Sequence, residues 1–319
     1  MKIIILDGKA LNPGDLDYGC FNQFGEVTIY EQTESEDEAI ARIADNEIVL
    51  LNKVRITERL LNACPNIKLI CVQATGYNVV DCEACAKRGI PVTNVPSYGT
   101  AAVAQFTLAL MLEMCHKVGL HNESVHNGDW CKAESFCYWL TPQMELAGKT
   151  LGIIGFGRIG QAVAKLAKAF GMDVIVYNRS QSEEGKKLAQ YADLDTVLKK
   201  ADFLSLHCPL FPDTERIINA QNIAKMKDGA MLINTSRGPL LDEQAVYEAL
   251  ESGKLRYAAV DVVSQEPITT DNPLLKAKNC IITPHMAWVP VESRQRLLDC
   301  VVENIRAFLN GKPQNVVNM

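Results

Sequence analysis

The chain has 319 residues, of which 48% are hydrophobic, so it can bury an ample core, and its length predicts two domains. The formal net charge of −6 excludes a global basic field, so we expect neither nucleic acid nor a membrane surface as a partner. The N-terminal apolar run ends at Asp7, too short for a signal peptide, and the longest nearly apolar stretch, 101–112, is too short to span a bilayer. We therefore expect a soluble, cytoplasmic protein.

The eleven cysteines are an odd number without the spacing of a disulfide framework, and most lie in apolar runs, which indicates reduced and buried thiols. Cys82-Glu-Ala-Cys85 has C-x-x-C spacing, but it lies in a predicted helix and no second pair of ligands accompanies it. We expect no metal site and no redox role there.

The first hundred residues alternate short β-rich runs with polar helical segments, which predicts a small parallel sheet. Ser35 and Glu38 have the spacing of a capping box and indicate the start of one helix. The predicted strands are 2–7, 27–31, 47–52, 67–72 and 91–95.

Polar loops follow two of these strands. Asn52 and Lys53 come after one, and Thr75 and Gly76 after another. Both loops should lie on the carboxyl edge of the sheet, where open α/β sheets bind ligands. Thr75 and Gly76 could offer backbone N–H groups to a carboxylate, although an ordinary glycine turn is the alternative.

The middle of the chain begins with a long apolar helix over 99–117, a candidate for the first crossing between domains. Residues 121–148 then form a segment that is predicted to be irregular. It is rich in aromatic residues, which favours either a dimer contact or a loop that covers its own subunit. These aromatic residues are Trp130, Phe136, Tyr138 and Trp139.

The run G-F-G-R-I-G places Gly155, Gly157 and Gly160 directly after an apolar strand. A helical pattern over 161–170 and a second strand over 173–177 complete a βαβ unit. Gly155 allows the turn, Gly157 lets a pyrophosphate approach the backbone, and Gly160 lets the helix pack closely on the strand. The helix N-terminus then binds the anion, so the unit predicts a dinucleotide site.

A second sheet is predicted from strands 151–154, 173–177, 203–208, 230–235, 257–261 and 280–285. Each strand is followed by a polar residue at its carboxyl end, which places these residues along the same crevice as Gly155. They are Cys208 with Pro209, Arg237, Asp261 and His285.

Two of these residues, together with Glu266, have chemistry suited to a carboxylate next to a carbonyl group. The Arg237 guanidinium can bind a carboxylate through two hydrogen bonds and polarise a neighbouring carbonyl, with a surface ion pair as the alternative. His285 is the best general acid, because imidazole titrates near neutral pH. Glu266 could accept a hydrogen bond from its other ring nitrogen. The remaining histidines, His116, His121, His126 and His207, are interpreted as packing or surface residues, with His207 near the cleft.

The motifs G-F-G-R-I-G, H-C-P-L, N-T-S-R-G, D-V-V-S-Q-E-P and T-P-H-M-A-W resemble those of the D-isomer-specific 2-hydroxyacid dehydrogenases, in the same order and over essentially the whole chain. The resemblance implies an NAD(P)-dependent, reversible reduction of a 2-keto acid to the D-2-hydroxy acid. It also implies that Arg237 binds substrate, that Glu266 supports His285 as acid and base, and that dimers form through the cofactor domain.

The resemblance implies an α/β fold with a Rossmann dinucleotide-binding domain over 99–286. A smaller flavodoxin-like substrate-binding domain is built from 1–98 and 287–319, with interdomain helices near 100–117 and 293–309. The implied cofactor contacts are Gly155, Gly157, Arg158, Ile159, Gly160, Asn178, Arg179, Ser180, Cys208, Pro209, Thr235, Ser236 and Asp261. The implied substrate contacts are Asn52, Lys53, Thr75, Gly76, Arg237, His285 and Trp288.

Within the family, Leu6-Asp-Gly8, Phe136-Cys-Tyr-Trp139 and His285-Met-Ala-Trp288 are similar to the glycerate dehydrogenase and hydroxypyruvate reductase branch. Hydroxypyruvate or glyoxylate is therefore the expected substrate. A broad-specificity 2-keto-acid reductase or a D-lactate dehydrogenase is the nearer alternative. A dinucleotide-sensing binding protein on the same fold is the remote one.

One position departs from the pattern of NAD enzymes. The acid expected after the second Rossmann strand is replaced by Asn178, and Arg179 and Ser180 follow. An acid would repel a 2′-phosphate, whereas this trio can accept one. NADP(H) is therefore favoured, and NAD(H) stays possible through a hydrogen bond from Asn178 to the ribose.

Overall fold

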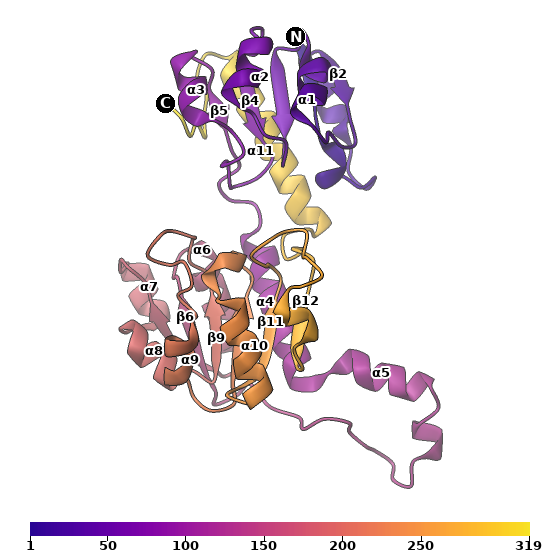
Figure 1. The fold of residues 1–319 in the computed structure, drawn as a ribbon, viewed down its shortest axis with the longest axis vertical. Helices are drawn as coiled ribbons and strands as arrows, with labels where there is room; N and C mark the ends of the chain where they lie inside the picture. The colour runs from indigo at the N-terminus through magenta and orange to yellow at the C-terminus, as the bar shows by residue number, and fades with distance from the viewer. The chain divides into compact units, whose positions relative to one another are not determined.

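The computed structural model describes residues 1–319, and the chain divides into two compact units (Figure 1). We call Met1–Gly99 with Val289–Met319 the terminal unit, and Thr100–Trp288 the central unit. The first boundary follows residue 99, where residue 98 was predicted, and the second lies before residue 289, where residue 287 was predicted. None of the helices combines the length and the apolar character needed to span a membrane.

The terminal unit contains a five-stranded sheet in the order β2-β1-β3-β4-β5, with every pair parallel. This is the strand order of flavodoxin-like sheets, and the direction of winding reverses between β1 and β3. Ligands of such sheets bind beyond the carboxyl ends of the strands at this reversal. The strands are β1 (Lys2–Ile5), β2 (Glu26–Ile29), β3 (Ile48–Leu51), β4 (Leu69–Val72) and β5 (Val92–Thr93).

Helices pack against this sheet over a core that includes Ile4, Val49 and Ile70. The Ser35 hydroxyl caps α1 by accepting the Glu38 N–H at 3.2 Å, as the capping box predicts. The helices are α1 (Glu36–Ile43), α2 (Glu58–Ala63), α3 (Cys82–Lys87) and α11 (Val291–Leu309), with 3-10 turns at Gly8–Ala10 and Tyr18–Phe24. The C-terminal helix α11 packs on β4, so this unit is built from both ends of the chain.

The central unit contains a seven-stranded parallel sheet in the order β12-β11-β10-β9-β6-β7-β8. The winding reverses between the adjacent strands β6 and β9, as in Rossmann sheets. The predicted α/β architecture is confirmed. The strands are β6 (Thr150–Ile154), β7 (Asp173–Tyr177), β8 (Gln190–Tyr191), β9 (Phe203–Leu206), β10 (Ala230–Asn234), β11 (Leu255–Val260) and β12 (Cys280–Ile282).

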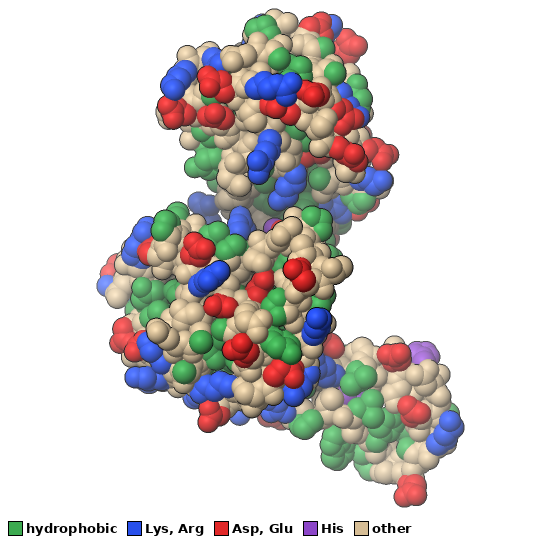
Figure 2. Space-filling model, in the orientation of Figure 1, with side chains coloured by type: hydrophobic (Ala, Val, Ile, Leu, Met, Phe, Trp, Pro, Cys, Tyr) green, Lys and Arg blue, Asp and Glu red, His purple; other side chains and the backbone are tan.

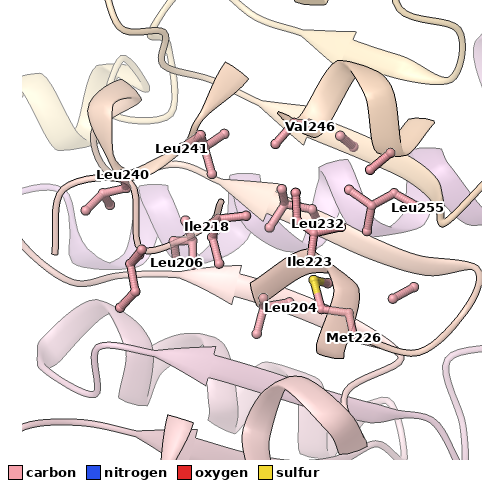
Figure 3. Packing of buried hydrophobic residues seen from close by; sticks show 14 of the residues in the cluster. Leu204, Leu206, Ile218, Ile223, Met226, Leu232, Leu240, Leu241, Val246 and Leu255 are labelled. Atoms are coloured by element: carbon pink, nitrogen blue, oxygen red, sulfur yellow. The ribbon is translucent and has the colours of Figure 1, made fainter. Parts of the chain in front are cut away.

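Both faces of this sheet are covered, because alternate residues of each strand point to opposite sides. Leu204 lies in the cluster drawn in Figure 3, whereas its neighbour Phe203 lies in the cluster on the other face. The helices are α4 (Thr100–His116), α6 (Arg158–Ala169), α7 (Glu183–Leu188), α8 (Leu194–Lys200), α9 (Ala220–Lys225) and α10 (Glu243–Ser252), with 3-10 turns at Gly238–Leu240 and Pro273–Lys276.

An arm extends from the central unit between α4 and β6 (Figure 1). The expectation of an irregular segment is wrong at its start, because α5 (Val118–His126) is helical and a 3-10 turn follows at Trp130–Lys132. Three of its four aromatic side chains are exposed, Trp130 at 52%, Phe136 at 87% and Trp139 at 67%, whereas Tyr138 is partly buried with its hydroxyl 3.0 Å from that of Ser124. Hydrophobic side chains gather on the arm in Figure 2.

Several predicted boundaries are corrected. Helix α6 begins at Arg158 and not at residue 161, because Gly157 is already its N-cap. Strand β12 ends at Ile282 and not at 285, just ahead of Pro284, which has no N–H for a sheet hydrogen bond. His285 therefore lies in a loop. Strand β8 was not predicted, since two residues leave no period to read.

Candidate active site

The glycine-rich loop lies at the reversal of the central sheet, where β6 meets β9. Gly155 has φ +93°, and a Cβ there would lie 2.3 Å from the backbone nitrogen of Cys208. A Cβ at Gly160 would lie 2.4 Å from the Gly155 oxygen. Only glycine allows this turn and these close approaches.

Gly157 differs from these two glycines, because a Cβ built on it would meet no atom within 4 Å. Helix α6 starts at the next residue and no side chain caps its N-terminus. Open space beside an uncapped helix start fits the pyrophosphate of a dinucleotide, which the helix N–H groups and dipole can bind. Gly157, Arg158, Ile159 and Gly160 would hold it.

The loop after β7 is tied to the glycine-rich loop. The Asn178 side-chain oxygen accepts the Phe156 N–H at 2.9 Å, and its amide nitrogen donates to the Ser180 carbonyl at 2.6 Å. Arg179 is exposed, and its guanidinium carbon lies 5.7 Å from the centre of the Phe211 ring. Arg179 makes no ion pair, so its charge is available to an anion.

His207 and Cys208 directly follow β9, and their backbone packs against the glycine-rich loop at Gly155. The His207 N–H donates to the Ile154 carbonyl at 2.7 Å, and its ring Nε2 lies 2.8 Å from the Ser205 hydroxyl oxygen. Burial lowers the pKa of His207 to about 3 and raises the pKa of the Cys208 thiol to about 11. Both side chains are therefore neutral near pH 7 and packed in place.

The loop after β10 presents Arg237. The Asn234 side chain accepts the Ser236 N–H at 3.0 Å and donates to the Arg237 carbonyl at 2.9 Å, which fixes the turn. A Cβ at Gly238 would lie 1.9 Å from the Val263 carbonyl carbon, so glycine lets this loop touch the segment after β11. The Arg237 guanidinium is exposed and donates only to the Ser236 carbonyl. It makes no ion pair, which removes the alternative reading of this residue.

His285 and Glu266 meet in the structure. His285 Nδ1 lies 2.7 Å from Glu266 Oε2, and both side chains are about one-third exposed, at 33% and 36%. The other Glu266 oxygen accepts the Val263 N–H at 3.3 Å. The carboxylate thus orients the ring and leaves Nε2 free to exchange a proton.

The backbone that carries His285 is held by Asp261, which is 1% exposed. One oxygen of its carboxylate accepts the Thr283 hydroxyl at 2.5 Å and the Met286 N–H at 2.8 Å. The other accepts the Ala287 N–H at 2.8 Å. His285 has φ +53°, in the left-handed region that few residues other than glycine adopt, and the three hydrogen bonds to Asp261 hold the loop in this conformation.

In the terminal unit, the loop after β4 offers two free donors. The Thr75 hydroxyl donates to the Val95 carbonyl at 2.8 Å, and Asn94 donates to the Thr75 carbonyl at 2.7 Å. The backbone N–H groups of Thr75 and Gly76 have no acceptor within the protein. Two unpaired N–H groups on a fixed turn suit a carboxylate.

The loop after β3 is held by Asp7, which follows β1 and is 6% exposed. Its carboxylate accepts the N–H groups of Asn52 at 2.8 Å, Lys53 at 2.6 Å and Val54 at 3.3 Å. Burial raises the pKa of Asp7, and these three hydrogen bonds oppose that shift. The Lys53 side chain is exposed and makes no ion pair.

The structure therefore places the predicted residues in two sets, one at the carboxyl edge of each sheet. Arg237, Asp261, Glu266 and His285 belong to the central edge with the glycine-rich loop, and Asn52, Lys53, Thr75 and Gly76 to the terminal edge. Thr235 is turned inward, with its hydroxyl 3.2 Å from that of Thr107, and Trp288 is the last residue of the central unit.

Sequence reasoning missed Asp7 and Thr283 as parts of the site. Both lie within motifs quoted above, Leu6-Asp-Gly8 and T-P-H-M-A-W, but nothing in the sequence shows which loop each side chain holds. Their role depends on bonds to loops that are 45 and 22 residues away in the chain.

Comparison with known proteins gives a consistent picture. Residues 108–287 match the family described as D-isomer specific 2-hydroxyacid dehydrogenase, NAD binding domain. A hydroxypyruvate reductase of Blautia hydrogenotrophica is 52% identical over 322 aligned positions, which cover 100% of both chains. A glycerate dehydrogenase of Methylorubrum extorquens is 40% identical, with 99% of this chain and 98% of that protein covered.

Among solved structures, an acyclic imino acid reductase in complex with NADPH and D-Arg superposes with a TM-score of 0.86. It is 32% identical in sequence, and the alignment covers 99% of this chain and 100% of the other.

Proposed function

Because the chain belongs to the D-isomer specific 2-hydroxyacid dehydrogenase family, we propose that it interconverts a small 2-keto acid and its D-2-hydroxy acid at the residues described above. The observation that carries the assignment is the 2.7 Å contact between His285 and Glu266, on the same sheet edge as the unpaired Arg237. An acid and an unpaired cation are the groups that carbonyl reduction needs.

The residues divide the work of reduction. A bound NAD(P)H supplies the hydride. Arg237 binds the carboxylate and polarises the carbonyl, and His285 gives its Nε2 proton to the carbonyl oxygen as that oxygen gains charge. Glu266 holds the ring through Nδ1 and stabilises its protonated form. In the reverse direction His285 takes the proton back.

The terminal edge is proposed to bind the acid group of the substrate. The free N–H groups of Thr75 and Gly76 suit its carboxylate, and Asn52 and Lys53 add an amide and a positive charge. Trp288 completes the proposed substrate contacts.

The proposed substrate is hydroxypyruvate, with D-glycerate as the product, and glyoxylate as a second substrate. Support comes from the names of the relatives that are 52% and 40% identical over nearly their whole length. A broader 2-keto-acid range, including pyruvate, is the alternative.

The proposed cofactor is NADP(H), with NAD(H) possible. The residue directly after β7 is Asn178 and not an acid, and its side-chain oxygen already accepts the Phe156 N–H. The exposed Arg179 and the neighbouring Ser180 are left to meet a 2′-phosphate. A bound NAD would use Asn178 against the ribose instead.

A homodimer formed through the central unit is also proposed. The arm exposes Trp130, Phe136 and Trp139, and large aromatic residues are enriched at protein interfaces. Sedimentation of the intact protein tests this, and cell fractionation tests the proposed cytoplasmic location.

The function itself is tested by initial rates of NADPH oxidation and, separately, of NADH oxidation, each with hydroxypyruvate, glyoxylate and pyruvate. We expect the highest kcat/KM with NADPH and hydroxypyruvate. A strong preference for NADH would contradict the cofactor proposal and leave the reaction standing. No turnover of any keto acid despite cofactor binding would contradict the enzyme and favour a dinucleotide-sensing protein.

A further inference from the structure

The feature of interest is the buried acid Asp7, which takes no part in the reaction described above. We propose that Asp7 is a positioning residue for substrate binding: its carboxylate fixes the backbone of residues 52–54 and thereby presents the Lys53 ammonium to the anionic group of the keto acid. This inference rests on the proposed function, in which Lys53 contacts the substrate.

The geometry is that of an anchor. One carboxylate accepts three successive backbone N–H groups, two of them at 2.8 and 2.6 Å. Hydrogen bonds to a charged acceptor are about twice as strong as neutral ones, so the peptide planes of Asn52 and Lys53 are held in one orientation. Asp7 and Asn52 are buried on either side of this contact, at 6% and 7% exposure.

The place of the anchor in the sheet supports the assignment. Asp7 follows β1 and Lys53 follows β3, and these adjacent strands flank the reversal of the terminal sheet. Ligands of open α/β sheets bind at this reversal.

The hydrogen bonds to Asp7 fix the backbone from which the Lys53 side chain extends. The Lys53 backbone is held between two buried residues, while its side chain is exposed and makes no ion pair, and its charge interacts with the Asp7 carboxylate through space. A cation on a fixed backbone loses less freedom when it binds an anion than one on a mobile loop.

The same anchor reaches the second loop of this edge. The Asn52 side chain donates to the Gln73 carbonyl at 2.8 Å, two residues before Thr75. The turn that offers the Thr75 and Gly76 N–H groups is also held by its own hydrogen bonds to Val95 and Asn94, so it should keep its place when Asp7 is replaced.

The test is a double-mutant cycle on the intact enzyme with hydroxypyruvate and NADPH. Asp7→Asn keeps the size of the side chain but turns an NH2 group toward backbone donors. We expect it to raise KM about tenfold with kcat within about threefold, because a misplaced binding group weakens substrate binding. In the Lys53→Met background the same change should raise KM less than about twofold, because coupled residues are not additive.

Two further measurements separate positioning from general stability. Amide hydrogen exchange of residues 52–54 should speed up in Asp7→Asn while exchange in β6 stays unchanged. Asp17→Asn is the matched control, since Asp17 is an exposed acid of the same unit that accepts one backbone N–H, from Gly19 at 2.7 Å. Its KM should equal that of the wild type.

The outcomes are distinct. An equal KM increase with and without Lys53 would overturn the inference, as would a fall in kcat with KM unchanged. If Asp7→Asn does not fold, Asp7→Glu keeps the charge and takes its place, and failure of both to fold would make Asp7 a structural residue only. An inactive wild-type protein would instead contradict the proposed function.

Discussion

The two sheet edges use the same device for different ends. In each unit a buried aspartate follows a parallel strand and accepts three donors from a loop that carries a proposed site residue. Asp7 holds the loop of Lys53, and Asp261 holds the loop of His285. A carboxylate that accepts three hydrogen bonds from one loop restricts the movement of that loop. Lys53 and His285 are therefore each carried on a backbone with a fixed conformation.

The difference lies in what the loops carry. The terminal edge presents a permanent cation and two free N–H groups, which can bind an anion but cannot move a proton at neutral pH. The central edge presents an imidazole paired with a carboxylate, which can. We therefore expect substitutions of proposed site residues at the central edge to lower kcat, and substitutions at the terminal edge to raise KM.

The strongest test of this division is His285→Gln. Positioned acid–base catalysis typically contributes about 10²- to 10⁴-fold, and glutamine cannot donate a proton in its place, so kcat for hydroxypyruvate should fall by that factor. Steady-state kinetics measure it, and NADPH fluorescence should show an unchanged Kd. His116→Gln, at the far end of α4, should retain wild-type kcat. A His285→Gln enzyme with near wild-type kcat would remove the assigned acid.

Asp261→Asn probes the support behind that acid. Its amide group cannot accept from all of the Thr283, Met286 and Ala287 donors, and each buried donor left unpaired costs about 1–3 kcal/mol. We expect a lower melting temperature and a kcat reduced about 10- to 100-fold, because a loop shifted by 1 Å misplaces the ring. Calorimetry and steady-state rates measure the two effects. A higher KM at unchanged kcat would break the comparison between the edges.

Lys53→Met probes the terminal edge. The substitution keeps an unbranched side chain, one atom shorter, and removes the charge, so the loss of one charge-assisted contact should raise KM for the keto acid about tenfold. The value of kcat should stay within about threefold. Lys9→Met, a change to another exposed lysine of the same unit, should leave both constants unchanged. A drop in kcat for Lys53→Met would show that this edge takes part in the chemistry.

The smallest expected effect concerns His207, which supports the cofactor loop. Burial lowers the folded-state pKa of His207 to about 3, so the unfolded chain binds more protons between about pH 3 and 6.5, and the folded state loses stability as the pH falls through this window. Between pH 7 and 5.5 the wild type should lose about 1 kcal/mol more of its unfolding free energy than His207→Gln. Urea unfolding at both pH values measures this difference. His126→Gln, a change at an exposed histidine, should behave as the wild type, and equal losses in all three proteins would show that His207 can be protonated when folded.

Much of the fold could be predicted from the sequence because its signals are local. The apolar run before Gly155, the glycines and the amphipathic pattern after them define a βαβ unit within thirty residues. The short strand β8 and the helical start of the arm were not predicted. Two residues carry no periodicity, and the aromatic residues after His126 hid the helical pattern before it.

The site was predictable to a smaller extent. His285 and Glu266 were paired by the chemistry of their side chains, and the structure brings them to 2.7 Å. The supports were not found, because Asp7 and Thr283 act through loops that only the folded sheet brings near them. Gly238 likewise shows its purpose only where a Cβ would overlap the Val263 carbonyl carbon.

The most direct test of the account is the configuration of the product. The proposed reaction forms the D isomer of the hydroxy acid, because the family to which the chain belongs is D-isomer specific. Chiral chromatography of the product formed from hydroxypyruvate and NADPH by the wild-type enzyme should give D-glycerate alone. A racemic product, or L-glycerate, would contradict the proposed arrangement of acid, binding groups and hydride.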